Sequence, residues 1–319
     1  MAHYRINVFA PLGLQRIYLL AHCRLNCIQI LFFIFIIAHV GNATAQVDTS
    51  KANTKKLWAL GIGVVPTASS YFLLNELWYK DYPRTQLHSF NDNDEWLQMD
   101  KVGHAFSAYQ LCKVYTSLYK WSTIDAETST LLGCTSSMLY LTSIELLDGR
   151  SAQWGFSWGD MLANASGNFL FFAQQKCWNE QRIALKFSYQ PSVYAKENPE
   201  LLGRNFQQRI IKDYNAQTYW ASFNIHPFLA SDAAFPRWLN LAIGYGATKM
   251  TTAKNVVDDV NNFQREREFY FSFDADLERV RWKKKWMRQT AKVLSFIKIP
   301  GPTLEIREGG NLKLHGLFF

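Results

Sequence analysis

The sequence has few cysteines, and their positions form no recognisable pattern. Of the five, Cys23 and Cys27 lie in an N-terminal segment that we expect to be removed, and neither follows the small residue that usually precedes a lipidated cysteine. Cys112, Cys134 and Cys177 each occur in an apolar stretch with helical patterning, and their odd number argues against a disulfide framework. A free cysteine in such a setting usually packs as a small hydrophobic residue. We therefore assign these cysteines no chemistry and predict no lipid anchor.

The sequence also lacks a large excess of positive or negative charge. The formal net charge is +8, and it falls to +5 once Arg5, Arg16 and Arg24 are removed with the N-terminal segment, which contains no acidic residue. Such a modest balance, without a nucleic-acid-binding motif, predicts no nucleic acid partner. Aromatic residues are abundant instead, with 23 Phe, 15 Tyr and 11 Trp. They fit a large buried surface or a membrane interface better than a loose polar chain.

Residues 1–46 have the organisation of a secretory signal peptide. Basic residues precede an apolar run from Ile28 to Val40, and Ala43-Thr44-Ala45 follows as a small-x-small cleavage site. The alternative is an uncleaved anchor, although a run of roughly 13 residues is short for a membrane-spanning helix. We therefore predict an exported protein of the outer membrane or periplasm of a Gram-negative-type cell.

Residues 47–180 have the patterning of a helical domain of about four helices. Leu57–Tyr79 is an apolar run of spanning length, interrupted by Pro66, and is either transmembrane or buried in a bundle. Three further helices are predicted over Glu95–Lys120, Ala126–Leu147 and Ser157–Phe172. Ser157 is a typical N-cap, and Asp160 favours the positive end of the helix dipole.

Polar residues gather at the ends of these apolar helices. The motif Asp-Lys-x-Gly-His opens one helix, Glu-x-x-Asp-Gly-x-Ser ends the next, and Gly-Phe-Ser-x-x-Asp with Asn-x-x-Gly begins the last. Asp160, Asn164 and Gly167 are spaced i, i+4 and i+7, which places them on one helix face. The candidate cluster consists of Asp100, Lys101, His104, Glu145, Asp148, Ser151, Asp160 and Asn164.

As a set, these motifs resemble domain-of-unknown-function family 2279, the YfiM-like periplasmic proteins. More distantly, the segment is similar to the VanZ-like membrane proteins. The resemblance covers about residues 85–175, and it implies a small helical bundle in the cell envelope without an established activity. The matching positions are Asp100, Lys101, Gly103 and His104, then Glu145, Asp148, Gly149 and Ser151, then Gly155, Phe156, Ser157, Asp160, Asn164 and Gly167.

The polar cluster admits two interpretations. One histidine, several carboxylates and a lysine could bind a metal ion or a phosphate head group. Alternatively, they form a hydrogen-bonded network that fixes the register of the helices, because buried polar groups need partners. In that case Asp148 is a turn residue and Lys101 a solvated helix end. We name no metal and no cofactor.

A catalytic role finds only partial support in the motifs. Arg150, Phe156 and Asp160 are spaced like the last motif of lipid-phosphate phosphatases, Arg-x5-His-x3-Asp. Phenylalanine stands where those enzymes have their nucleophile, and it cannot attack phosphorus. We therefore favour a protein that is not an enzyme.

Residues 181–319 change from helical to alternating patterning, which predicts a β-rich domain. Apolar residues alternate with small or polar ones in six segments, so each strand has one apolar and one polar face. Such strands fit a half-buried antiparallel sheet or lipid-facing strands of an outer-membrane protein. The segments are 183–190, 219–226, 239–246, 269–274, 303–307 and 312–319.

The stretch from Arg279 to Lys298 carries eight basic residues and no acid. Its aromatic residues recur at near-helical spacing, which predicts an amphipathic helix on an anionic membrane surface. The alternative is a helix that packs its tryptophans on the sheet. The residues predicted at the membrane surface are Trp282, Lys283, Lys284, Lys285 and Trp286.

These features together predict an α+β envelope protein with a helical part followed by an antiparallel β-rich part. We expect a structural, assembly or lipid-binding role, with a membrane lipid or an outer-membrane protein as partner. The alternative function is a hydrolase or binding module for a lipid or peptidoglycan precursor, using His104, Glu145 and Asp160. Oligomeric state does not follow from the residues.

Overall fold

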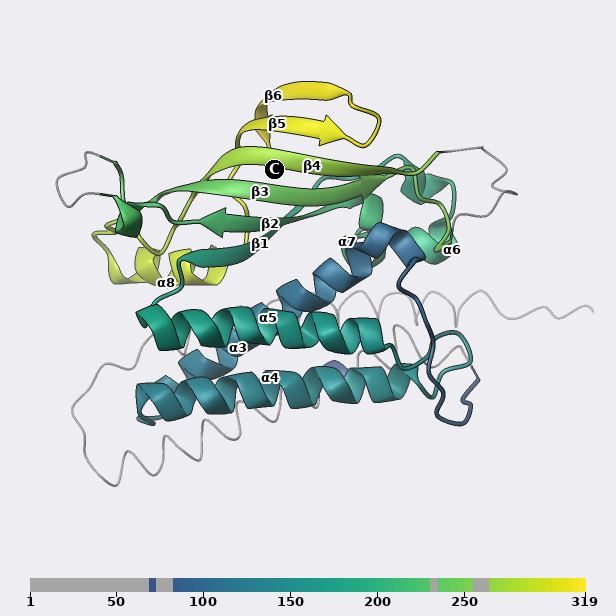
Figure 1. Cartoon of the computed structure of the whole chain (residues 1–319), viewed down its shortest axis with the longest axis horizontal. Helices are drawn as coiled ribbons and strands as arrows, with labels where there is room; N and C mark the ends of the chain where they lie inside the picture. The colour runs from purple at the N-terminus through teal and green to yellow at the C-terminus, as the bar shows by residue number, and fades with distance from the viewer. Residues whose placement is uncertain (1–68, 73–82, 230–234, 255–263) are drawn as a thin grey trace, which may run out of the picture.

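The computed structural model describes residues 69–72, 83–229, 235–254 and 264–319. The predicted signal peptide lies outside these residues, as does all of Leu57–Tyr79 except a helical stretch at 69–72. The described chain is α+β, as predicted. Long helices come first in the sequence, and an antiparallel sheet follows them (Figure 1).

Three long helices of the described part pack on one another: α3 (Met99–Trp121), α4 (Ala126–Asp148) and α5 (Trp158–Trp178). Two of them, α4 and α5, begin at a capping side chain. Asp125 accepts a hydrogen bond from the backbone N–H of Thr128 at 2.9 Å, and Ser157 accepts one from that of Asp160 at 3.1 Å. The bounds of α4 agree with the prediction to within one residue. The predicted start of α3 at Glu95 is wrong, because α3 begins at Met99, and α5 continues past Phe172 to Trp178.

Two glycines allow α3 to approach its neighbours closely. A Cβ atom at Gly167 of α5 would lie 2.0 Å from the carbonyl oxygen of Ala105, and one at Gly133 of α4 would lie 2.7 Å from the backbone nitrogen of Thr116. Because no side chain fits in either gap, glycine is the residue that permits this spacing. The close approach brings the ends of the helices together at the polar cluster.

A short 3-10 helix, η2 (Glu95–Gln98), leads into α3 through an unusual backbone. Trp96, Leu97 and Gln98 have φ values of 49°, 51° and 64°, in the left-handed region that residues with a Cβ atom rarely adopt. The sheet fixes this turn, because Tyr245 donates a hydrogen bond to the Leu97 carbonyl and Arg267 donates one to Gln98 Oε1 at 2.9 Å. The first turn of α3 is therefore held in place by the C-terminal half.

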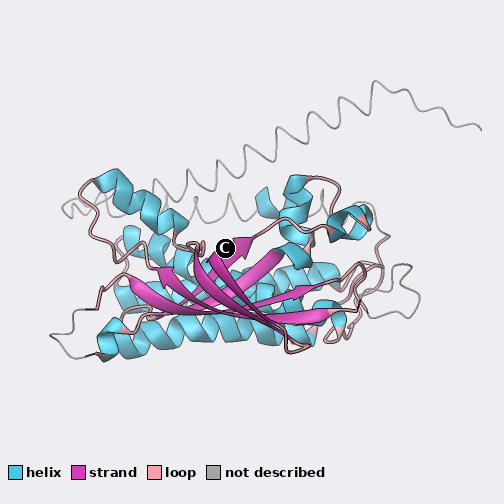
Figure 2. Cartoon of the chain, turned by 90° about the horizontal axis from the view of Figure 1, so that it is seen from above, coloured by secondary structure: helices cyan, strands magenta, loops and turns pink. Residues whose placement is uncertain are grey.

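The strands of the described part form one antiparallel sheet in sequence order, as the alternation predicted. The strand nearest the helices is β1, and the twist of the sheet is visible from above (Figure 2). The strands are β1 (Ile183–Tyr189), β2 (Gln217–Phe223), β3 (Leu239–Thr248), β4 (Glu266–Ala275), β5 (Gly301–Arg307) and β6 (Leu312–Phe318).

The polar face of the sheet is buried. Lys186 and Asp274 form an ion pair of 2.6 Å with both side chains almost fully enclosed, and Ser222 donates to the same carboxylate at 2.6 Å. Trp220 packs on Tyr270, and Tyr270 stacks on Phe318 of the last strand with ring centroids 4.7 Å apart. The sheet therefore curls around its polar side.

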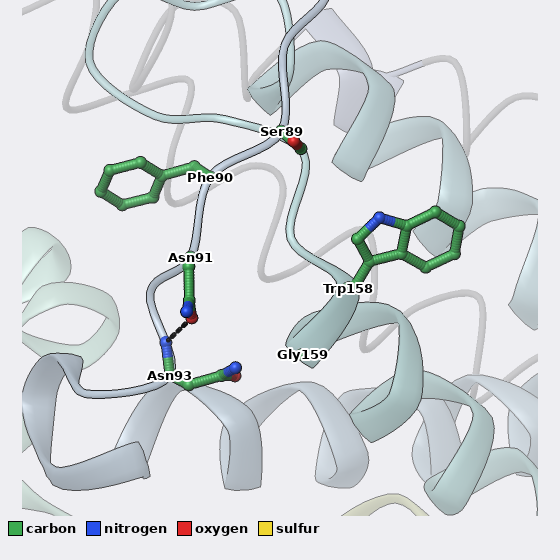
Figure 3. Close-up of a pocket in the computed structure, with 6 residues that line it drawn as sticks. All are labelled: Ser89, Phe90, Asn91, Asn93, Trp158 and Gly159. Carbon is green, nitrogen blue, oxygen red and sulfur yellow. Dashed lines mark hydrogen bonds between the residues drawn. The ribbon is translucent and has the colours of Figure 1, made fainter.

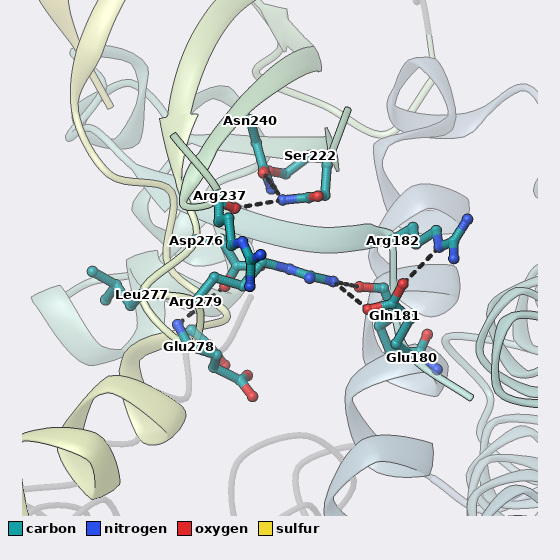
Figure 4. A network of polar contacts seen from close by, with 12 residues as sticks. Glu180, Gln181, Arg182, Ser222, Arg237, Asn240, Asp276, Leu277, Glu278 and Arg279 are labelled. Atoms are coloured by element: carbon teal, nitrogen blue, oxygen red, sulfur yellow. Dashed lines mark hydrogen bonds and ion pairs between the residues drawn. The ribbon is translucent and has the colours of Figure 1, made fainter. Parts of the chain in front are cut away.

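The basic helix is shorter than predicted, and the prediction of one helix over Arg279–Lys298 is wrong at both ends. The structure has α8 at Lys285–Leu294 only. Before it, Arg279 pairs with Asp276 at 3.0 Å and with Glu180 at 3.2 Å, which ties this loop to the end of α5 (Figure 4). After it, Lys298 is fully buried against the sheet. These two charges have specific partners, and so they do not belong to a solvated face.

Short elements between β1 and β2, and after β2, were not predicted, because none spans enough turns to show periodicity. They are η3 (Tyr194–Lys196), α6 (Pro199–Leu202), α7 (Phe206–Lys212), η4 (Tyr214–Ala216) and η5 (His226–Phe228). Those between β1 and β2 lie at the Tyr189–Gln217 end of the sheet, and η5 follows β2 at the opposite end.

Candidate functional site

The polar cluster lies where the start of α3, the end of α4 and the start of α5 meet. Asp100, Lys101 and His104 occupy the first turns of α3, Glu145 the last turn of α4, and Asp160 with Asn164 the first turns of α5. The structure therefore brings six of the eight predicted residues together. Each comes from a helix end whose position is set by the packing and caps described above.

His104 is the centre of the cluster. Its Nδ1 lies 3.1 Å from Asn164 Oδ1, in hydrogen-bonding range, and 3.6 Å from Glu145 Oε1. Its Nε2 lies 3.8 Å from Asp160 Oδ1 and 3.9 Å from Asp100 Oδ1, both too long for a hydrogen bond. Three carboxylates therefore surround one imidazole, and only the Asn164 amide bonds to it directly.

Lys101 is a member of the cluster and not a solvated helix end, so that interpretation is wrong. Its ammonium lies 2.7 Å from Asp92 Oδ2, 2.8 Å from Asp160 Oδ1 and 3.3 Å from Asp100 Oδ2. Its side chain is 13% exposed. Burial lowers the lysine pKa, but the adjacent Asp100 and Asp160 outweigh burial, and the pKa is raised.

The carboxyl groups differ in how their charge is compensated. Burial raises the pKa of Glu145 to about 8, and burial together with the charge of Asp100 raises the pKa of Asp160 to about 7. Burial also acts on Asp100, but His104 and Lys101 outweigh it and lower its pKa. For His104, burial opposes the charged form, yet Asp100 and Asp160 raise its pKa. The site thus concentrates negative charge beside one imidazole.

Two buried polar atoms next to the imidazole make no hydrogen bond to any group that the structure describes. They are Oε1 of Glu145 and Nδ2 of Asn164. Both side chains are fully enclosed. The other oxygen of Glu145 accepts a long hydrogen bond of 3.4 Å from the Ser157 backbone. A fully satisfied network would not leave these atoms without partners.

Two predicted members, Asp148 and Ser151, lie on the turn that follows α4 rather than beside His104. The Ser151 backbone N–H bonds to the Asp148 carbonyl at 3.0 Å, and its hydroxyl accepts from the Gln153 N–H at 3.3 Å. Asp148 reaches the site through its charge, which contributes to raising the pKa of Glu145. The turn interpretation of Asp148 agrees with this geometry.

Two residues of the site, Asp92 and Tyr214, were missed in the sequence. Asp92 accepts hydrogen bonds from Lys101 and from the Ser157 hydroxyl, the latter at 2.6 Å. Tyr214 donates to Asp100 Oδ1 at 2.6 Å from far along the chain. Asp92 lies in a polar loop and Tyr214 in a stretch interpreted as a turn, and neither type of segment signals a distant contact.

A pocket lies beside the cluster, between the loop before η2 and the start of α5 (Figure 3). A Cβ atom at Gly159 would lie 3.0 Å from Lys101 Cε, so this glycine separates the pocket from the buried lysine. The pocket lining is mixed, with the polar residues Ser89, Asn91 and Asn93 opposed by the aromatic side chains of Phe90 and Trp158. It is formed by Ser89, Phe90, Asn91, Asn93, Trp158 and Gly159.

The helical segment is similar to a known protein family. Residues 89–181 match the family model DUF2279, described as a predicted periplasmic lipoprotein. The DUF2279 segment includes α3, α4, α5 and the whole cluster except Tyr214, so the predicted family resemblance is confirmed. Its description supports a location in the cell envelope, whereas the VanZ-like resemblance stays a prediction. No curated protein and no solved structure matches the chain.

The DUF2279 description includes a lipid anchor, which the sequence did not predict. Cys23 and Cys27, the cysteines before Cys112, lie outside the described residues. Within the described residues, α4 is long and apolar enough to cross a membrane by length and composition. Those two properties do not distinguish a spanning helix from the core helix of a bundle, and α4 carries the buried Glu145.

Proposed function

We propose that this protein is a non-catalytic envelope component that lies against a membrane through the apolar face of its sheet. The outer membrane is the proposed location, and the role is structural or in assembly. One observation carries the proposal, which is that strands β3 to β6 present their apolar residues to the outside and their polar residues to the inside.

One row of residues, paired from strand to strand across the sheet, shows that the apolar face is on the outside. It begins at Leu185 and Ala221, where the sheet packs on α3 and α5, and continues through Ile243, Phe271, Leu304 and Leu314. The last four are 45%, 46%, 37% and 78% exposed. They are adjacent on neighbouring strands, so they form a contiguous apolar surface. Large apolar patches of this kind mark sites of protein or membrane contact.

The residues on the opposite face of the sheet are buried, and they include charged side chains. Lys186, Trp220, Tyr270 and Glu305 are buried, and they are paired across the strands in the same register. Apolar-out and polar-in is the alternation of strands that face lipid in the outer membrane. We infer lipid as the occupant of the outer surface because the envelope location supplies it.

The basic helix gives a second reason to choose a bilayer. Lys283, Lys284, Lys285 and Trp286 are exposed, with Trp286 at 60%. Basic residues near an anionic surface each contribute on the order of 1 kcal/mol to binding, and tryptophan favours the head-group region. Exposed lysines beside an exposed tryptophan thus complement an anionic membrane.

The test is flotation of the purified mature chain with liposomes, anionic in one series and zwitterionic in the other. The variant Phe271→Gln/Leu314→Gln is expected to lose at least tenfold in binding to both lipid types. Lys283→Gln/Lys284→Gln/Lys285→Gln is expected to lose only the preference for anionic lipid, by about 1 kcal/mol for each charge near the surface.

Val193→Gln provides the matched control, because Val193 is exposed but lies outside these strands, and it should bind as the unchanged chain does. A chain that does not float in either series would contradict the proposal. A stable dimer in sedimentation that Phe271→Gln/Leu314→Gln separates would assign the surface to a second copy instead.

The second candidate function is a hydrolase or binding module for a lipid or peptidoglycan precursor. The observation in its favour is that His104 stands beside Asp160 and Glu145, whose pKa values of about 7 and about 8 suit proton transfer near neutral pH. An abundant His104→Gln protein that fails to complement a deletion strain would favour this candidate over the structural role.

A further inference from the structure

The tautomer of His104 is set by one neighbour. Asn164 Oδ1, an acceptor, lies 3.1 Å from Nδ1, so Nδ1 carries the proton and donates it. Nε2 is then left with its lone pair. That lone pair is on the side of the ring where Asp100 and Asp160 lie. Fixing one imidazole nitrogen by a hydrogen bond while the other ligates a metal is the usual arrangement of metal-bound histidines.

On the Nε2 side, two carboxylate oxygens are too far from the imidazole for a hydrogen bond, and a cation could lie between them and Nε2. Asp100 Oδ1 is 3.9 Å away and Asp160 Oδ1 is 3.8 Å away. All three ligand atoms lie within 4.8 Å of one another. Ligands bound to one tetrahedral zinc at about 2.0–2.1 Å are separated by about 3.4 Å, so each carboxylate oxygen would have to move about 0.5 Å closer to Nε2 for both to bind the same ion.

The charge around the ring selects a cation over a phosphate. Asp92, Asp100, Asp160 and Glu145 supply four carboxyl groups, against which the cluster offers Lys101 and the imidazole. An anion would face these carboxylates, whereas a divalent cation would offset them. Glu145 adds to the negative charge from the other edge of the ring, where its buried Oε1 lies 3.6 Å from Nδ1.

We propose that Asp100, His104 and Asp160 bind one divalent transition metal ion, of the Zn²⁺ or Mn²⁺ class, which links α3 to α5. Imidazole suits the transition metals and carboxylate suits manganese and zinc, so this mixed set disfavours Mg²⁺ and Ca²⁺, which prefer oxygen ligands alone. Asp100 and His104 are spaced i, i+4 on one face of α3, and Asp160 faces them from α5.

Neighbouring groups orient these ligands. Tyr214 donates to Asp100 Oδ1 at 2.6 Å, which fixes this carboxylate from the β-rich half. Asn164 fixes the imidazole from α5. Lys101 Nζ lies 2.8 Å from Asp160 Oδ1, so its ammonium competes with a metal ion for that oxygen. Lys101 therefore limits the affinity of the site, and Asn164 supports it.

The experiment measures metal binding by calorimetry on the full mature chain, with ZnCl₂ and MnCl₂ as probes and MgCl₂ and CaCl₂ for comparison. The expected result is one equivalent of Zn²⁺ or Mn²⁺ with micromolar or tighter affinity. Asp100→Asn and Asp160→Asn should each lose at least tenfold. Asn164→Ala should lose 10- to 100-fold as a positioning residue. Lys101→Met should bind as tightly as the unchanged chain or more tightly.

Glu127→Gln is the matched control, since it removes an acid from the first turn of α4, at the opposite end of that helix from Glu145, and its metal affinity should be unchanged. Circular dichroism verifies that each variant is folded, and Asp100→Asn changes the most exposed ligand of the three. A folded unchanged chain that binds neither Zn²⁺ nor Mn²⁺ at 100 µM (about 5 kcal/mol) would overturn the proposal. So would folded Asp100→Asn and Asp160→Asn proteins that bind as the unchanged chain does.

Discussion

At the scale of single residues, Lys298 is buried although its neighbours in the sequence predict an exposed lysine. It follows a basic, exposed helix, yet it is completely buried, with Nζ donating to the Phe273 carbonyl at 2.8 Å and the Ile299 carbonyl at 2.6 Å. Its ammonium also lies 4.9 Å from the centre of the Trp220 ring. Burial lowers the pKa of Lys298 from 10.5 to about 8, and this burial effect outweighs the attraction of Asp274.

A pH dependence of stability follows from this shift. Between about pH 8 and 10.5 the unfolded chain holds a proton on Lys298 that the folded chain has released. Raising the pH through this window therefore stabilises the fold, by at most about 1.4 kcal/mol per pH unit. Chemical denaturation between pH 8 and 9.5, below the range where tyrosines ionise, should show this slope.

Lys298→Met should flatten the slope, because the methionine does not titrate. Lys292→Met removes an exposed lysine of α8 and serves as the control. This variant should keep the slope of the unchanged chain. An unchanged slope in Lys298→Met would assign the pH dependence to other groups.

At the scale of elements, the helical half depends on close approach rather than on large apolar side chains. Serine, threonine and glycine line the buried side of α4, including Ser129, Gly133 and Ser137. In α5, Gly167 meets the backbone of α3 directly. The relative position of helices packed in this way is sensitive to a single added methyl group, and the polar cluster depends on that position.

Gly167→Ala should destabilise the fold by about 1–3 kcal/mol, since its Cβ would lie 2.0 Å from the Ala105 carbonyl oxygen and force the helices apart. Gly316→Ala is the matched control, because no described atom lies within 4 Å of the added carbon, and it should be close to neutral. Urea unfolding of both variants measures the difference. Equal stabilities would show that α5 can shift without cost.

At the scale of the whole molecule, the two halves are joined at the polar cluster. Tyr214 and Tyr245 from the β-rich half bond to Asp100 and to the Leu97 carbonyl at the start of α3. Figure 1 shows the corresponding arrangement, with the sheet above the three long helices. A cation at the cluster and a membrane at the outer side of β3–β6 would therefore act on one connected structure.

Export is the prediction that concerns the whole chain. We expect the mature protein to begin near Gln46 or Val47, because Ala43-Thr44-Ala45 is a small-x-small cleavage site. Intact mass spectrometry of protein recovered from the envelope fraction gives its N-terminus. Recovery of the chain with residues 1–45 retained would instead show that the segment is an anchor. A mass increase on Cys23 or Cys27 would indicate the lipid anchor of the family description.

Local signals in the sequence located the long helices and the strands, and they indicated the resemblance to DUF2279. Alternation at period two located the strands of the sheet, and caps such as Ser157 located the helix starts, because both signals are local properties of the chain. The set of motifs around His104 likewise indicated the resemblance of residues 89–181 to DUF2279. Six members of the cluster were found in this way.

Only the tertiary structure decided which partners these residues have and which face of the sheet is exposed. Asp92 and Tyr214 joined the site, and Lys101 and Lys298 became buried, because these contacts connect segments distant along the chain. The alternation along β3–β6 shows that one face is apolar, but it does not show what covers that face. Among the described residues, the helical half covers this face at β1, at β2 and, through Met99, at the Tyr245–Ala247 end of β3. The rest of β3 and the strands β4 to β6 keep an apolar outer surface, which no local pattern could reveal.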